Sequence, residues 1–221
     1  MIFGPRSLLA LSMLLLFLVA GWLGGATSGA DRQIAAFAAE TREAVPVLSE
    51  LARLVTRLGG AAITLPAGLV AVLLLLSRKR LKLALLLAVT VLGERLLVDL
   101  LKATLGRPRP PGGEYLVESM AFPSGHAANS MTVYLGIALL ALPDRHRRAL
   151  AIAAVSLSVL IGLTRVFLGV HWMSDVIGGW ALGLALVMLA VSWWERSAPH
   201  VEAKHEIVGG HLDPAGKHHS L

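Results

Sequence analysis

The stretch that decides the fold is residues 176–194, VIGGWALGLALVMLAVSWW, which contain no aspartate, glutamate, lysine or arginine. A helix of this length crosses the hydrocarbon core of a bilayer. Two other long runs, 7–30 and 58–77, are equally free of these residues. The chain of 221 residues is 56% hydrophobic and only 15% charged, whereas soluble domains contain about 25% charged residues. The sequence therefore predicts an integral membrane protein.

Working outward from residues 176–194, apolar runs separated by polar turns predict an all-α bundle of six membrane-spanning helices. The expected spans are 7–24, 58–76, 81–101, 126–142, 149–168 and 176–194. They form one membrane domain, residues 1–194, followed by a polar tail, 195–221, that we expect to be disordered and cytoplasmic. The tail contains histidines whose irregular spacing does not fit a metal site, namely His200, His205, His211, His218 and His219.

Two segments near the N-terminus leave alternatives open. Residues 7–24 could be a signal peptide, because Ser28-Gly29-Ala30 resembles a small-residue cleavage site. The length of the apolar run favours a retained helix. Residues 31–57 are mixed and amphipathic, with apolar positions at helical spacing. We expect one or two helices here, which either lie on the membrane surface or pack as solvated helices on the bundle.

The charged residues predict an orientation. The net charge is +6, and the absence of cysteine excludes disulfides and thiolate metal sites. A basic chain can bind nucleic acid, but here lysines and arginines gather in two tight turns, 77–82 and 143–148, as the positive-inside rule expects. We therefore expect no nucleic-acid partner. With six spans, these turns and both termini are cytoplasmic, and residues 102–125 and 169–175 face outward.

The residues before the last span bring reactive side chains to that outer face. His171 and Asp175 are four residues apart, so on a helix they share one face and can hydrogen-bond. A carboxylate that holds one imidazole nitrogen leaves the other as a base or nucleophile. Arg165 is a permanent cation with a planar fork suited to phosphate. By itself this spacing is more typical of a structural pair.

Two more stretches are expected at the same face. Lys102 and Arg109 belong to a proline-rich loop, and both could surround a phosphoryl group. Arg107 lies between them and has two interpretations. It either contacts a lipid headgroup or a second phosphate, or it is a solvated loop charge, and we slightly favour the second. Ser124 and Gly125 open the fourth span, where free N–H groups of a helix N-terminus can bind phosphate oxygens.

Together these residues predict an anion cage with two histidines. Phosphoryl transfer depends mainly on positioning and charge stabilisation. His171 has a carboxylate within reach, so we expect it to be the nucleophile. His126 lies beside the phosphate-binding turn and has no acid at helical spacing, so we expect it to protonate the leaving oxygen.

The third span carries Glu94, Arg95 and Asp99. Ionisable groups in a span are costly and usually face a bundle interior or a water-filled site. Arg95 and Asp99, at i and i+4, could neutralise each other as a structural ion pair. A supporting role beside the site is at least as well founded, because Lys102 follows closely. We expect Asp99→Ala to lower activity or folding yield by stranding Arg95 or loosening Lys102.

The three stretches resemble the type 2 phosphatidic acid phosphatase (PAP2) superfamily, whose signatures are K-x6-R-P, P-S-G-H and S-R-x5-H-x3-D. Residues 102–110, 123–126 and 164–175 fit them, with Thr164 in place of the serine. The resemblance implies a bacterial membrane lipid phosphatase that uses a phosphohistidine intermediate and neither metal nor other cofactor. The roles it implies are nucleophile for His171, orienting acid for Asp175, leaving-group acid for His126, and phosphate ligands for Lys102, Arg109, Ser124, Gly125 and Arg165.

The expected reaction is hydrolysis of a lipid phosphate or pyrophosphate at the outer face of a bacterial inner membrane, toward the periplasm. Small bacterial members of the family act on undecaprenyl pyrophosphate, phosphatidylglycerol phosphate, phosphatidic acid or lipid A. One alternative keeps the site but passes the phosphoryl group from His171 to another lipid. Another is a non-catalytic protein that binds or transports anionic lipid, a role that the ionisable residues of the third span would suit.

Overall fold

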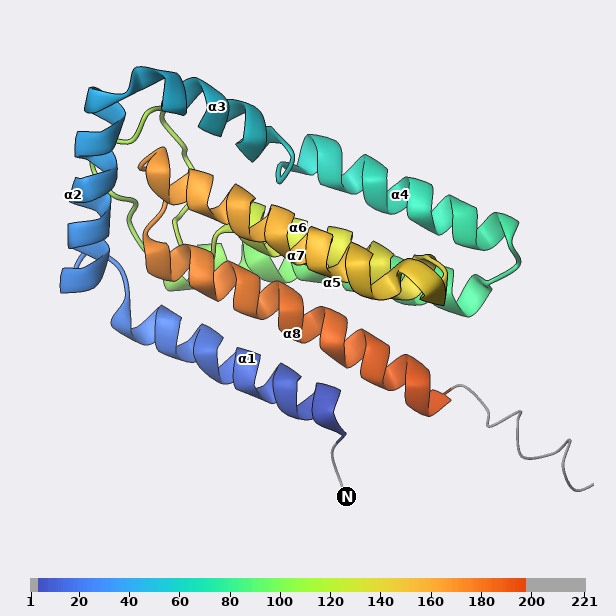
Figure 1. Cartoon of the computed structure of the whole chain (residues 1–221). Helices are drawn as coiled ribbons and strands as arrows, with labels where there is room; N and C mark the ends of the chain where they lie inside the picture. The colour runs from blue at the N-terminus through green and yellow to red at the C-terminus, as the bar shows by residue number, and fades with distance from the viewer. Residues whose placement is uncertain (1–3, 198–221) are drawn as a thin grey trace, which may run out of the picture.

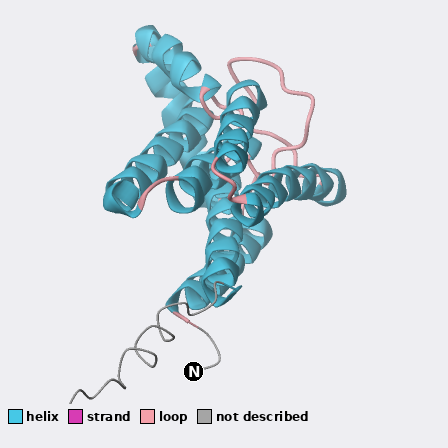
Figure 2. Ribbon diagram, turned by 90° about the vertical axis from the view of Figure 1, so that its right-hand side faces the viewer, coloured by secondary structure: helices cyan, strands magenta, loops and turns pink. Residues whose placement is uncertain are grey.

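The structure is a computed structural model that describes residues 4–197, and this part of the chain consists of helices and loops without a strand (Figure 2). The all-α prediction is confirmed. The prediction for the tail beyond residue 197, with its histidines, lies outside the described residues. The elements are α1 (Pro5–Leu23), α2 (Gly29–Ala44), α3 (Pro46–Arg57), α4 (Ala61–Ser77), α5 (Leu81–Leu105), α6 (Gly125–Gly136), the π-helical turn η1 (Ile137–Ala141), α7 (Asp144–Phe167) and α8 (Met173–Ser197).

Helix α8 lies at the centre of the bundle. It packs against α1, α5, α6 and α7, while α4 packs against α5 and α6 (Figure 1). Small residues let α6 and α8 approach closely: a Cβ added at Gly179 would lie 2.5 Å from the carbonyl oxygen of Ser124. The apolar run that predicted a membrane span is therefore also the buried axis on which the other helices pack.

Four helical segments of the described chain are long and apolar enough to cross a membrane: Pro5–Leu23, Pro46–Ser77, Arg145–Phe167 and Met173–Ser197. Helices also occupy the other two expected spans, but α5 contains Glu94, Arg95 and Asp99, and α6 is only 12 residues long before η1. Large apolar side chains cover the outside of the bundle, as lipid contact requires; examples are Leu15, Leu18, Leu73, Val89 and Leu96.

The amphipathic segment 31–57 lies in two helices, α2 and α3. Ser28 caps α2, because its Oγ accepts a hydrogen bond from the backbone N–H of Asp31 at 3.3 Å, and Pro46 begins α3. Helix α3 packs on α7, and α2 packs on both α7 and α8. Phe37, Leu51 and Leu54 remain exposed on these helices. Both helices are thus attached to the bundle while apolar side chains point outward.

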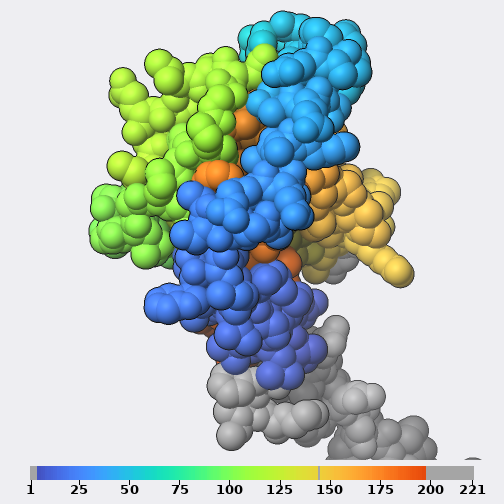
Figure 3. All heavy atoms as spheres, turned by 90° about the vertical axis from the view of Figure 1, so that its left-hand side faces the viewer, coloured from blue at the N-terminus to red at the C-terminus, as the bar shows by residue number. Residues whose placement is uncertain are grey.

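The two ends of the bundle differ. Helix α2, the start of α3 and the loop 106–124 cover one end, and Figure 3 looks onto it, with the loop in green beside α2 in blue. The basic turns, the start of α1 and the end of α8 lie at the other end, where Arg6 forms an ion pair with Glu195 (Figure 1). The reactive residues described below belong to the first end.

Candidate active site

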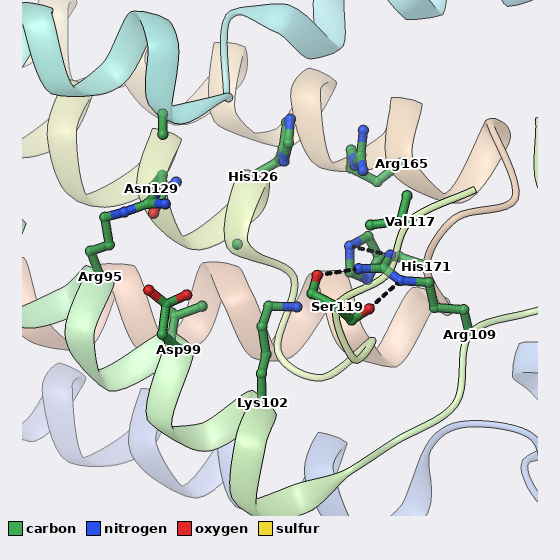
Figure 4. A pocket seen from close by; sticks show the side chains of 13 residues that line it. Arg95, Asp99, Lys102, Arg109, Val117, Ser119, His126, Asn129, Arg165 and His171 are labelled. Carbon is green, nitrogen blue, oxygen red and sulfur yellow. Dashed lines mark hydrogen bonds between the residues drawn. The ribbon is translucent and has the colours of Figure 1, made fainter. Parts of the chain in front are cut away.

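A cavity of about 220 Å³ lies between α5, α6, α7 and the loop 106–124. Each of the three predicted stretches contributes two residues to its wall (Figure 4). The lining residues are Ala61, Arg95, Val98, Asp99, Lys102, Arg109, Val117, Ser119, Gly125, His126, Asn129, Arg165 and His171. Segments that are far apart in the sequence therefore meet around one space that is lined by four cationic side chains.

The geometry around His171 determines which ring nitrogen carries the proton. Nη1 of Arg109 lies 3.1 Å from Nε2 of His171. A guanidinium has only donors, so Nε2 must accept this bond and the proton resides on Nδ1. Nδ1 faces Oδ2 of Asp175 at 3.4 Å, and the same oxygen accepts a hydrogen bond from the backbone N–H of Trp172 at 2.8 Å. The unprotonated nitrogen therefore points into the cavity.

Burial and positive charge keep this imidazole neutral. His171 is 2% exposed. Desolvation and then the charges of Arg109, Arg165 and Lys102 lower the pKa of His171 well below its ordinary value. A neutral imidazole can attack phosphorus, whereas a protonated one cannot. The surrounding cations thus favour the neutral form of His171.

The loop 106–124 holds two of the cations in the resting structure. Arg109 donates from Nε to the carbonyl oxygen of Ser119 at 2.7 Å and from Nη2 to its Oγ at 3.1 Å, and it also donates to the carbonyl of Val170. Lys102 donates to the carbonyl of Met120. Burial, followed by repulsion from Arg165, lowers the pKa of Arg109 to about 10, so its guanidinium remains charged at neutral pH.

Arg165 is positioned by residues of α3 and of the same loop. Its side chain is 3% exposed, and Nη1 donates to Oγ1 of Thr56 at 3.1 Å and to the hydroxyl of Tyr115. Its Nε has no hydrogen-bond partner within the described chain. A buried guanidinium N–H without a partner suits an anion that enters the cavity.

The start of α6 supplies uncharged donors. Ser124 is the N-cap residue, but its fully buried Oγ bonds to no residue that the structure describes. The backbone N–H of Ser124 donates to the carbonyl of Asp175 at 2.9 Å, which ties this turn to the His171 loop. Gly125 lines the cavity, and His126 follows it. His126 also borders a second opening between α3 and residues 115–117, so it lies between the cavity and the outside.

The interpretation of Arg107 as a solvated loop charge is wrong. Its side chain is 10% exposed and pairs through Nη1 with Oδ1 of Asp175 at 2.8 Å. Nη2 donates to the carbonyls of Ala20 and Gly21 at 3.0 and 2.6 Å, and the guanidinium lies over the ring of Phe122, 4.4 Å from its centroid. The buried carboxylate of Asp175 needs a counter-charge, and Arg107 provides it.

The Arg95–Asp99 ion pair, one of the two alternatives for these residues, does not form among the described residues, where both side chains line the cavity instead (Figure 4). Glu94 is 1% exposed, and its Oε1 has no hydrogen-bond partner in the described chain. Glu94 is not among the cavity residues. Of Glu94, Arg95 and Asp99, the last two therefore line the cavity, and the reason that Asp99→Ala would strand Arg95 no longer holds.

Ser119 and Asn129 line the cavity but were absent from the sequence prediction. Asn129 follows His126 by three residues, so helical spacing alone could have placed both on one face. Ser119 belongs to an irregular loop, and no local pattern in the sequence indicates that it would bond to Arg109.

Comparison with known proteins agrees with this arrangement. Residues 82–199 match the model of the PAP2 superfamily. The chain is 33% identical to a phosphatidylglycerophosphatase B of Bacillus subtilis, over 85% of this chain and 94% of that protein. It is 31% identical to an undecaprenyl-diphosphatase of Sulfolobus acidocaldarius, over 55% of this chain and 60% of that one.

A solved structure gives the same result for the fold. The crystal structure of a transmembrane PAP2 type phosphatidylglycerolphosphate phosphatase from Bacillus subtilis superposes with a TM-score of 0.78 at 33% sequence identity, and the match covers 86% of this chain and 98% of that one. The cage residues, the helical architecture and these matches lead to one conclusion: the chain belongs to the PAP2 superfamily.

Proposed function

We propose that this membrane PAP2 lipid phosphatase hydrolyses its substrate through a phosphohistidine formed on His171. The observation that carries the proposal is the contact between Arg109 and Nε2 of His171 at 3.1 Å. It fixes an unprotonated nitrogen beside a donor that is suited to a phosphoryl oxygen. The side chain of Lys102 and the unpartnered Nε of Arg165 supply further positive groups at the same cavity.

In the first step, Nε2 of His171 attacks phosphorus, and the bond from phosphorus to the leaving oxygen breaks. His126 donates a proton to that oxygen, so the lipid leaves as an alcohol or as a lipid monophosphate. Asp175 stabilises the positive charge that develops on His171 through Nδ1. Lys102, Arg109 and Arg165 stabilise the equatorial oxygens, with Ser124 Oγ and the backbone N–H of Gly125 as neutral donors.

In the second step, water attacks the phosphohistidine. His126, now neutral, takes a proton from the water. The N–P bond breaks, inorganic phosphate forms, and Nε2 of His171 recovers its lone pair. The net reaction consumes one water for each phosphate released, and both histidines return to their starting protonation states.

We place residues 1–194 in one membrane domain of six spans, with α5 and the α6–η1 segment as the third and fourth. The support is that helices occupy all six expected ranges and run alongside one another. We also propose a bacterial inner membrane as its location. The orientation, with the site toward the periplasm and the termini in the cytoplasm, is supported by the positive-inside rule, because the basic turns lie at the end opposite the cavity.

The proposed substrates are lipids with a terminal phosphate, of the phosphatidylglycerol phosphate, undecaprenyl pyrophosphate or phosphatidic acid type. Two of these classes are named in the relatives described above. A cavity next to exposed apolar helices suits a substrate whose headgroup reaches the cage while its tail stays in the bilayer.

The test is to trap the intermediate. Purified protein is mixed with lipid phosphate, quenched within one turnover and digested, and the peptide containing His171 is analysed by mass spectrometry for an acid-labile phosphoryl group. We expect the group on wild-type protein and its loss, together with phosphate release, in His171→Ala.

The matched control is His146→Ala, which removes an exposed histidine from the basic turn at the opposite end. This variant should keep both the intermediate and the phosphate release. Full phosphate release by His171→Ala in a clean preparation would refute the proposal. Phosphate release that falls when a second lipid is added, with the phosphoryl group appearing on that lipid, would instead identify a phosphotransferase.

A further inference from the structure

The cavity continues past the phosphate cage along α5. Arg95, Asp99 and Lys102 line it together, and their spacing of i, i+4 and i+7 places them on one face of the helix. Lys102 belongs to the cage. Arg95 lies seven residues earlier, which corresponds to about 10 Å along the helix axis. The cavity therefore has a second polar section, formed by Arg95, Asp99 and Asn129, which we call the α5–α6 section.

The side chains of the α5–α6 section have no partners of their own. Arg95, Asp99 and Asn129 form no side-chain hydrogen bond or salt bridge with the rest of the chain from residue 4 to residue 197. Asn129 is 7% exposed, and it lines the cavity together with Arg95 and Asp99. Figure 4 shows the guanidinium of Arg95 directed toward Asn129 and away from Lys102. Asp99 is exposed and Arg95 is partly exposed, so a ligand that enters the cavity can reach both side chains.

An apolar groove begins where this section ends. It runs between α4 and α5 and is lined by Leu65, Leu69, Val72, Ala88, Val91 and Leu92, among others. Val91 precedes Arg95 by one helical turn, and Leu65 follows the cavity residue Ala61 by one turn. Phosphate cage, polar section and apolar groove thus follow one another along α5, in the order of terminal phosphate, headgroup and lipid tail.

We propose that Arg95, Asp99 and Asn129 bind the part of the leaving group that links the terminal phosphate to the tail, and that this part carries a second anionic phosphate behind a hydroxylated spacer. Arg95 and the Asn129 amide supply donors for phosphate oxygens. Asp99 is an acceptor suited to a hydroxyl group. The inference rests on the proposed function, since it assumes that the terminal phosphate occupies the cage.

The spacing favours a glycerol-linked pair of phosphates over a pyrophosphate. The two phosphorus atoms of a pyrophosphate share one oxygen and cannot extend from Lys102 to a guanidinium nearly two helical turns away and directed elsewhere. A carboxylate between the two cations would also repel a directly attached second phosphate. A glycerol unit supplies the distance between the two phosphates, and its hydroxyl group can donate a hydrogen bond to Asp99.

The experiment compares two substrates in one preparation. Phosphatidylglycerol phosphate and phosphatidic acid with identical acyl chains are hydrolysed by wild-type protein and by Arg95→Gln. Loss of a charged hydrogen bond should lower kcat/KM for phosphatidylglycerol phosphate by about tenfold and for phosphatidic acid by less than about twofold. The ratio of the two values does not depend on how much protein is folded, so a poor yield does not obscure the result.

Three comparisons complete the test. Arg78→Gln, an exposed arginine in the basic turn far from the cavity, should leave the ratio unchanged. Asn129→Ala should shift the ratio in the same direction as Arg95→Gln. An isoprenyl pyrophosphate should respond to Arg95→Gln as weakly as phosphatidic acid does.

An unchanged ratio in Arg95→Gln, or an equal loss on all three lipids, would overturn the second subsite while leaving the phosphatase function intact. A larger loss on the pyrophosphate than on phosphatidylglycerol phosphate would overturn the preference for a spacer. Failure of wild-type protein to release phosphate from every lipid would refute the proposed function itself.

Discussion

Arg107 and Asp175 form a buried ion pair of 2.8 Å between residues 68 positions apart in the sequence. The carboxylate of Asp175 is 0% exposed, and its other oxygen faces His171 and the backbone N–H of Trp172. One guanidinium therefore neutralises the acid that orients the proposed nucleophile. Through Ala20 and Gly21 it also connects that acid to the end of α1.

Arg107→Gln is expected to destabilise the protein and to lower kcat. Removal of one partner of a buried ion pair costs about 3–5 kcal/mol, and an unpaired Asp175 no longer holds His171 in place. Arg107→Lys should recover part of both losses, because it restores the charge without the fork. Thermal unfolding in detergent and phosphate release measure the two effects.

The control for this prediction is Arg53→Gln, which breaks an exposed pair with Glu50 and Glu114. It should change stability little, because water screens such pairs. Equal stability of the Arg107→Gln and Arg53→Gln proteins would show that the ion pair with Asp175 is not required.

Acid should weaken the fold through His171. Its folded-state pKa lies well below the ordinary value of 6.5, so the unfolded chain takes up a proton at a pH where the folded protein does not. Stability therefore falls as the pH drops below the unfolded-state pKa and is unaffected by this residue above it. Between about pH 7.5 and about pH 5.5, wild-type protein should lose more stability than His171→Asn, which cannot titrate.

The measurement for His171 is the midpoint of thermal unfolding across this pH range for both proteins. Other groups titrate in both alike, so the difference between the two curves isolates His171. Parallel curves would mean that the pKa of His171 is the same in the folded and unfolded states.

Ser124→Ala should separate activity from stability. Ser124 Oγ is fully buried without a hydrogen-bond partner in the described chain, so its removal costs the fold little. Loss of a donor to the phosphoryl oxygens should lower kcat on the order of a hundredfold. Unfolding midpoints and phosphate release test this prediction.

Ser158→Ala is the matched control for Ser124. Its Oγ donates to the carbonyl of Ala154 at 2.8 Å inside α7, away from the cavity. This variant should lose some stability and keep its activity per folded molecule. Retained activity in Ser124→Ala together with lost activity in Ser158→Ala would argue against a phosphate contact for Ser124.

Gly179→Ala should disrupt the packing of α6 on α8. The new Cβ would lie 2.5 Å from the carbonyl oxygen of Ser124, a backbone atom that cannot rotate away. Overpacking of this kind costs about 1–3 kcal/mol or more, and it displaces the turn that carries Ser124 and Gly125. Both the unfolding midpoint and the activity should fall.

Gly68→Ala provides the contrast, since its Cβ would have 3.7 Å to the nearest atom, Cγ1 of Val91. A helical alanine in that space should be neutral or stabilising by up to about 1 kcal/mol. If Gly179→Ala had the same unfolding midpoint and activity as Gly68→Ala, α6 and α8 could move apart without losing stability or activity.

Most of the helices could be predicted because their determinants are local. Runs without charge, such as 176–194, need no knowledge of the fold, and the proline at position 46 marks the start of α3. The three PAP2 stretches could likewise be recognised from spacing alone. The structure brings them to one cavity because the long loop 106–124 returns across the end of the bundle.

The partners of the loop residues could not be predicted, because they are determined by tertiary packing. Arg107 looks solvent-exposed in a proline-rich segment, yet it pairs with an acid in another helix. Arg95 and Asp99 have ideal spacing for an ion pair, yet the cavity offers both side chains an alternative direction. Spacing along a helix predicts which face of the helix a side chain lies on, but not which residue or cavity faces it across the bundle.

The hydrogen bonds from Arg109 and Lys102 to the loop carbonyls have a consequence for turnover. In the resting protein, oxygens of Ser119, Met120 and Val170 occupy donors that a phosphate would use. An arriving phosphoryl group must exchange places with these oxygens, and they can return when phosphate departs. These backbone oxygens occupy the positions that the anion would take. The free energy of phosphate binding is therefore the difference between hydrogen bonds to phosphate and hydrogen bonds to these oxygens. In the proposed reaction, such an exchange would limit retention of the inorganic product and keep the cations aligned between reaction cycles.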